Sequence, residues 1–201
     1  MMKNSLKLLD AAVFLAIGYF AVGFFNEYYA TADVSHALKF DAVYILALTY
    51  IMARRPDVNT ITLALIILLS RVIDIAVFNY NLNELSGFVY YPLLLISNLV
   101  AVAAIWTRPV LFSRLSPWKN NKNFAVTHQD NVLAMLFIFQ AGFMFLLLVE
   151  HGLRRVNDWM ANNFLMLYNA MPAVQLLSTI VLFAILYYMT FDKAKEKRPD
   201  R

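Results

Sequence analysis

The chain has 201 residues, of which 61% are hydrophobic and 15% are charged, and its formal net charge is +4. An ordinary soluble domain carries about 25% charged residues, so this composition excludes a typical soluble protein and indicates an integral membrane protein. The chain has no cysteine, which excludes disulfides, thiolate metal sites and a cysteine nucleophile.

Six apolar segments approach the length needed to cross a bilayer, about 17 to 25 residues per helix. In chain order they are residues 8–25, 36–53, 61–78, 88–106, 131–149 and 164–190. The second is the weakest, because Lys39 and Asp41 lie near its start. None alternates polar and apolar residues as a barrel strand does. We therefore predict an all-α, polytopic membrane helix bundle that forms a single transmembrane domain over residues 1–201.

The first segment could also be read as a secretory signal, because a basic start precedes it and "YYATA" follows at residues 28–32. Its apolar stretch, residues 8–25, is longer than the 7 to 15 residues or so of a signal core, so we interpret it as a membrane span.

Lysine and arginine define the predicted orientation. If alternate connections lie on opposite sides of the membrane, most of the 17 cations fall on the side that holds both termini and residues 107–130. The positive-inside rule then places that side in the cytoplasm of a bacterial-type inner membrane. The basic charge is thus an orientation signal, and we expect no binding to nucleic acid.

Arg71 and Asp74 interrupt the third span three positions apart, so they share a helix face. A charge at mid-bilayer costs at least about 2.5 to 3.5 kcal/mol, and an opposite charge beside it lowers that cost. The predicted topology brings further polar residues to the same outer half, namely Glu27, Tyr90, Glu150 and Asn169. Together these residues predict an outward-facing polar cavity for a small ion or solute. The alternative is one structural salt bridge within an interfacial ring of polar side chains.

Residues 107–130 form the longest polar connection, and they mix basic and apolar side chains. The candidates for contact with a partner are Arg108, Arg114, Trp118, Lys119 and Lys122. This segment is either a connector anchored to lipid headgroups or a docking platform for another protein.

Other polar residues within the spans have simpler interpretations. Ser97, Asn98, Gln140, Gln175 and Ser178 are expected to form hydrogen bonds between helices. Pro172 predicts a kink or a break in the last span. The three histidines have no spacing typical of a metal or haem site, so we predict no metal and no cofactor.

No motif typical of an enzyme active site occurs in the sequence, and we predict a protein that is not an enzyme. The leading hypothesis is a membrane protein that binds or translocates a small ion or solute through the outer cavity. The alternative is a membrane sensor, scaffold or assembly subunit that docks a protein partner through residues 107–130. Membrane lipid is an expected partner, and small residues in the first span are compatible with a homo-oligomer.

Overall fold

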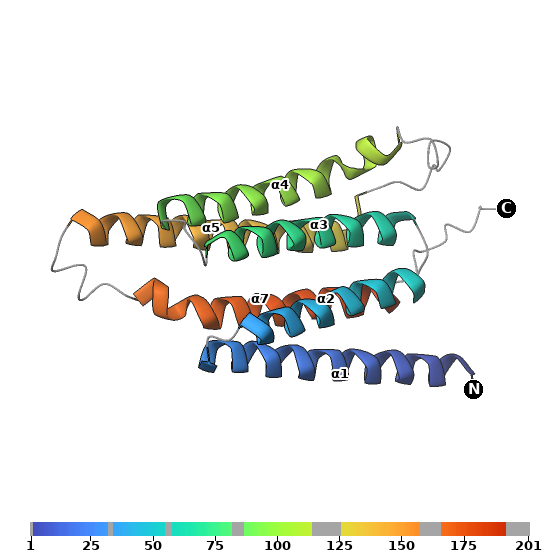
Figure 1. The fold of residues 1–201 in the computed structure, drawn as a ribbon. Helices are drawn as coiled ribbons and strands as arrows, with labels where there is room; N and C mark the ends of the chain where they lie inside the picture. The colour runs from blue at the N-terminus through green and yellow to red at the C-terminus, as the bar shows by residue number, and fades with distance from the viewer. Residues whose placement is uncertain are drawn as a thin grey trace. The chain divides into compact units, whose positions relative to one another are not determined.

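The computed structural model describes residues 2–31, 34–54, 58–81, 87–113, 126–156 and 166–191. Nearly all of them are helical, in the helices α1 (Met2–Thr31), α2 (Val34–Arg54), α3 (Val58–Asn81), α4 (Gly87–Ser113), α5 (His128–Val156) and α7 (Met166–Phe191). No strand occurs in these ranges. The predicted all-α class is therefore confirmed (Figure 1).

Five of the described helices are long and apolar enough to cross a membrane, which indicates a multi-pass membrane protein. They are α1, α3, α4, α5 and α7. Helix α2 forms over the predicted second segment and carries Lys39 and Asp41 in its first half. Large apolar side chains such as Leu15 and Phe139 are exposed, as lipid-facing residues are.

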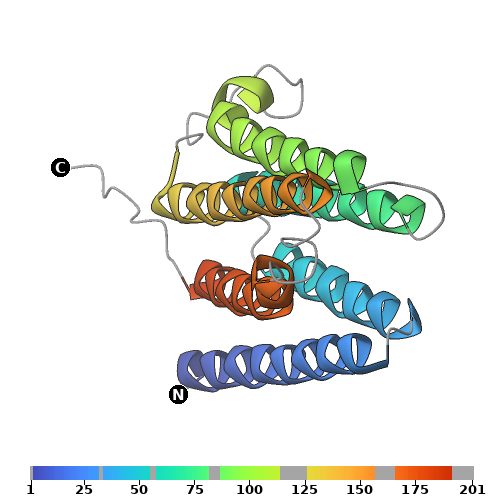
Figure 2. The ribbon, with the colours of Figure 1, turned by 90° about the vertical axis from the view of Figure 1, so that its left-hand side faces the viewer.

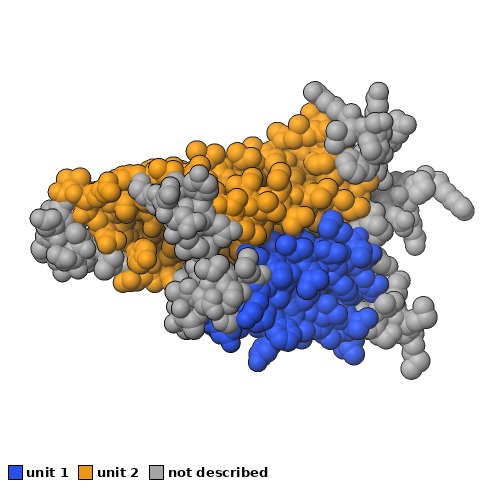
Figure 3. Space-filling model, viewed as in Figure 1, with its two compact units in different colours: residues 1–55, 183–201 blue, residues 56–182 orange. Residues whose placement is uncertain are grey.

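The chain divides into two compact units, which Figure 3 shows in different colours. Unit 1 contains residues 1–55 and 183–201, and unit 2 contains residues 56–182. The boundary between them falls within α7. The single transmembrane domain expected from the sequence stays a prediction.

In unit 1, α1 packs against α2, and a polar contact ties the two helices together at one end. The guanidinium of Arg54 donates two hydrogen bonds to Asp10, of 2.8 and 3.2 Å, and the Tyr50 hydroxyl donates a third of 2.6 Å. Phe14 packs edge-on against the rings of Tyr50 and Tyr187. Asp10 is thus a buried carboxylate that is well supplied with donors.

In unit 2, α4 packs against both α3 and α5, and Figures 1 and 2 show α4 and α5 lying side by side. A buried cluster joins α4 to α5 and consists of Tyr91, Leu94, Phe143, Met144 and Leu147. Four residues from the first turns of α7 also pack on this cluster, namely Leu167, Ala170, Met171 and Val174. Helix α7 continues through Pro172, so the structure has no helix break there.

Candidate functional site

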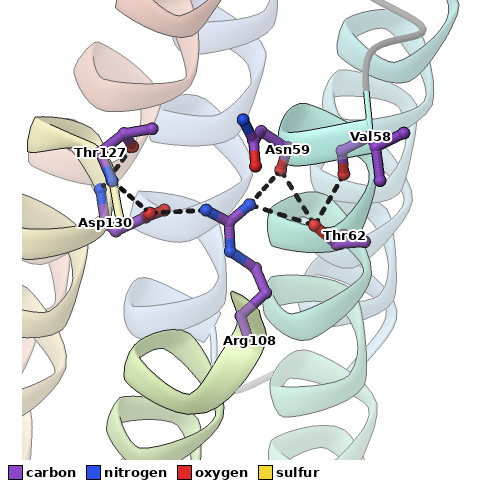
Figure 4. Close-up of polar contacts among 6 residues, drawn as sticks. All are labelled: Val58, Asn59, Thr62, Arg108, Thr127 and Asp130. Carbon is purple, nitrogen blue, oxygen red and sulfur yellow. Dashed lines mark hydrogen bonds and ion pairs between the residues drawn. The ribbon is translucent and has the colours of Figure 1, made fainter. Parts of the chain in front are cut away.

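A network of buried polar groups surrounds Arg108 at one end of unit 2, where α3 and α5 begin and α4 ends (Figure 4). We call Asn59, Thr62, Arg108, Thr127 and Asp130 the Arg108 network. The guanidinium donates to an Asp130 carboxylate oxygen at 2.6 Å on one side. On the other side it donates to the Asn59 carbonyl at 2.6 Å and to the Thr62 hydroxyl at 3.1 Å. The network therefore ties three helices together.

Asp130 also closes the first turn of α5. Its carboxylate accepts a hydrogen bond from the Thr127 N–H at 2.7 Å, and its own N–H donates to the Thr127 hydroxyl at 3.3 Å. These reciprocal bonds form a capping box, which satisfies backbone donors that the start of a helix leaves free. The same carboxylate thus caps one helix and pairs with the cation of another.

The position of Arg108 corrects the sequence analysis, which assigned it to an exposed connection beginning at residue 107. Helix α4 continues to Ser113, and the Arg108 side chain is 0% exposed. An ion pair with Asp130 lets a charge stay within the helix packing at an acceptable cost. Arg108 therefore does not present its charge to a docking partner.

The second polar constellation lies at the other end of α5. We call Tyr91, Glu150, Arg154 and the backbone N–H of Leu167 the Glu150 site. Glu150 is only 2% exposed, and one carboxylate oxygen accepts the Leu167 N–H at 3.0 Å, near the start of α7. The other oxygen, Oε1, is buried and has no hydrogen-bond partner among the described residues. The site thus holds a buried acid with only half of its acceptors used.

Arg154 lies on the same face of α5, four residues after Glu150, and its Nε atom is likewise buried without a partner among the described residues. Neither side chain forms an ion pair with any described residue. Tyr91 is buried within electrostatic range of both charges. An acidic and a basic side chain one helical turn apart on α5 therefore do not bond to each other.

His151 packs into the adjoining contact between α4 and α5. Its ring lies 4.9 Å from that of Phe88 and 6.0 Å from that of Tyr91, between ring centroids. A Cβ placed on Gly87 would come within 2.7 Å of His151 Nε2. A larger residue at position 87 would force the ring to shift, so glycine leaves room for the close approach of the imidazole to the backbone of α4.

The remaining residues of the predicted cavity are spread over both units. Asp74 accepts a hydrogen bond of 3.1 Å from Ser97, so it helps to join α3 to α4. Arg71 is half-buried and Asn169 is exposed, whereas Tyr90 packs against the apolar cluster of unit 2. Glu27 is exposed and belongs to unit 1. The predicted pairing of Arg71 with Asp74 stays a prediction.

The other docking candidates, Arg114, Trp118, Lys119 and Lys122, lie outside the described residues. Sequence reasoning missed two contacts, the capping role of Asp130 and the bonds of Asp10 to Tyr50 and Arg54. The first has a local signal, because Thr127 and Asp130 have capping-box spacing before an apolar segment. The contact of Asp10 with Tyr50 and Arg54 has only a topological signal, since the start of the first helix and the end of the second are predicted on the same side of the membrane.

The described residues contain no group of three or more His, Asp or Glu side chains that could hold a metal ion. No protein family model matches the chain, and no curated protein or solved structure matches it significantly. The two polar constellations are therefore the candidates for a functional site. Asp130 and Glu150 are 20 residues apart on α5, or about 30 Å, which is close to the thickness of a bilayer core.

Proposed function

We propose that this chain is a multi-pass protein of a bacterial-type inner membrane that binds or translocates a small ion or solute at the Glu150 site. One observation carries the proposal: the Glu150 carboxylate is buried, one of its oxygens has no partner among the described residues, and, unlike Asp130, it forms no ion pair with any of them. A buried charge without a partner costs several kcal/mol. Ionisable groups kept within membrane segments at such a cost commonly belong to ligand or ion pathways.

The predicted orientation supports this choice of site. If both termini are cytoplasmic, the end of α5 that carries Glu150 faces outward, and the end that carries Asp130 faces inward. The outer end then holds Glu150, which forms no ion pair with a described residue, and the inner end of unit 2 holds Asp130, which is paired with Arg108. This asymmetry suits a site that is loaded from outside.

The proposal moves the centre of the predicted cavity from Arg71 and Asp74 toward Glu150. Asp74 already receives a hydrogen bond from Ser97, so its carboxylate has a structural role. Arg71, Tyr90 and Asn169 remain candidates for the surrounding wall. Glu27 is left out because its exposed side chain belongs to the other unit.

Docking of a protein partner through residues 107–130 is the weaker hypothesis. Arg108 is buried, so one of the cations expected to contact a partner is lost from residues 107–130, and no described side chain of this segment supplies another. We propose a binding or transport role and no catalytic one.

The test compares Glu150→Gln with Glu27→Gln in the full chain, reconstituted in lipid nanodiscs. Glutamine keeps an oxygen for the Leu167 N–H but removes the charge, so we expect the unliganded Glu150→Gln variant to unfold at a higher temperature than the wild type. The probes are sodium, potassium, simple amines and amino acids. At least one should raise the unfolding temperature of the wild type and of Glu27→Gln, but not of Glu150→Gln. Equal shifts in all three proteins would refute the proposal.

A further inference from the structure

Glu150 and Arg154 are opposite charges placed to pair, yet they do not. At a spacing of four residues their Cβ atoms are about 5–6 Å apart on one helix face. A glutamate four residues before an arginine can form a salt bridge that stabilises the helix by about 0.2–0.5 kcal/mol. Here the carboxylate bonds to the Leu167 N–H instead, and no ion pair forms with any described residue.

Each of the two side chains keeps one buried atom unused. Glu150 Oε1 can accept a hydrogen bond and Arg154 Nε can donate one, and neither has a partner among the described residues. Each buried polar atom left in this state costs about 1–3 kcal/mol. Asp130 Oδ1 and Arg108 Nε are also left unused by the described residues, but those two side chains bond to each other, whereas Glu150 and Arg154 do not. One ligand with a donor cation and an acceptor anion would satisfy both atoms at once.

Glu150 and Arg154 have buried apolar neighbours on one side and partly exposed side chains on the other. Tyr91 and Leu147 are buried beside the charged pair, as part of the cluster that α7 covers. Arg154 is half-buried, and Tyr168 is 52% exposed at the edge.

We propose that the Glu150 site binds a zwitterion, with its ammonium on Glu150 Oε1 and its acidic group on Arg154. The inference rests on the proposed function and specifies its ligand class. Two sources supply this chemistry, a free amino acid and the headgroup of a zwitterionic lipid such as phosphatidylethanolamine. In both, the charged groups are a few atoms apart, which matches the spacing of one helical turn.

A bare metal cation suits the site less well. Calcium and magnesium take six or more oxygen ligands, and the site offers a single unused carboxylate oxygen. The Arg154 guanidinium beside it would repel a cation that brought no anion. A zwitterion is neutral overall and meets both charges.

The experiment uses the full chain in nanodiscs of phosphatidylglycerol, which contain no zwitterionic lipid. The twenty common amino acids are tested individually by equilibrium binding, and each ligand found is compared with the amine and the carboxylic acid that carry the same side chain. Glu150→Gln and Arg154→Gln are the test variants. Their controls are Glu27→Gln, in unit 1, and Arg155→Gln, whose guanidinium lies 5.1 Å from the centre of the Phe88 ring.

If the ligand is an amino acid, the matched amine and acid should each bind at least about tenfold more weakly. Each test variant should lower the affinity about ten- to a hundredfold, the usual effect of losing a hydrogen bond to a charged group, whereas the controls should change it little. If the ligand is a lipid headgroup, no amino acid binds. Phosphatidylethanolamine should then raise the unfolding temperature of the wild type but not that of the two test variants.

Two results would overturn the inference. If an amine alone or sodium binds as tightly as any amino acid, and Arg154→Gln leaves that binding unchanged, the ligand is a cation, and only the general function survives. If no probe binds and phosphatidylethanolamine has the same effect on all variants, both the zwitterion and the proposed function fail.

Discussion

Replacing Arg108 by methionine tests whether the Arg108 network holds unit 2 together. The substitution keeps most of the aliphatic stem but removes the hydrogen bonds to Asp130, Asn59 and Thr62. Asp130 would then be a fully buried carboxylate whose only described donor is the Thr127 N–H. Removing one partner of a buried ion pair costs about 3–5 kcal/mol, so we expect a loss of stability of that size.

A double-mutant cycle separates the ion pair from the helix cap. Asp130→Leu alone should cost about as much as Arg108→Met, plus about 1 kcal/mol for the lost cap of α5. The double variant leaves no unpaired charge, so its cost should fall well below the sum of the two single costs. We expect the coupling energy to exceed about 2 kcal/mol.

The assay is unfolding by sodium dodecyl sulfate in mixed micelles, followed by helicity. Arg155→Met is the matched control, because that arginine is exposed and contacts the face of a single ring, an interaction worth about 0.5–1 kcal/mol. A cost below about 1 kcal/mol for Arg108→Met, or additive costs in the cycle, would show that the buried pair does not stabilise the fold.

Two smaller predictions concern the other contacts between helices. In unit 1, Tyr50→Phe removes one hydrogen bond to Asp10 and should cost about 1 kcal/mol. Arg54→Met removes two hydrogen bonds and leaves a buried carboxylate without its cation, so it should cost more, and a smaller loss in the same unfolding assay would contradict this ranking. In unit 2, Gly87→Ala places a methyl group against the His151 ring and should cost about 1–3 kcal/mol. That cost should disappear in a His151→Ala background, and its persistence there would show that the ring is not the obstacle.

The helices of this chain could be predicted from hydropathy because a bilayer imposes one length and one polarity on each span. The prediction lost accuracy where charges occur inside helices. The apolar run of α4 stops at Trp106, so hydropathy predicts a loop at Arg108, although the helix continues to Ser113. A hydropathy pattern scores a charge as exposed because it contains no information about the counter-charge, Asp130, on another helix.

The polar site was predicted only in part for the same reason. Glu150 was included among the candidates because of its position near the end of a span. Its distinguishing property, a buried carboxylate that forms no ion pair with a described residue, depends on how α5 and α7 pack. Arg154 was counted only as an orientation signal, since nothing in its sequence neighbourhood shows that its Nε is buried.

Asp130 both pairs with Arg108 and caps α5, and these two roles bear on how the chain enters the membrane. An arginine at the centre of a lone helix makes insertion less favourable by about 2.5–3.5 kcal/mol, and Arg108, near the end of α4, adds a smaller cost of the same kind. The compensating carboxylate is in the first turn of α5, where its capping box also starts that helix. Helices α4 and α5 are therefore expected to leave the translocon as one hairpin, with the charges neutralised between them before either helix meets lipid alone.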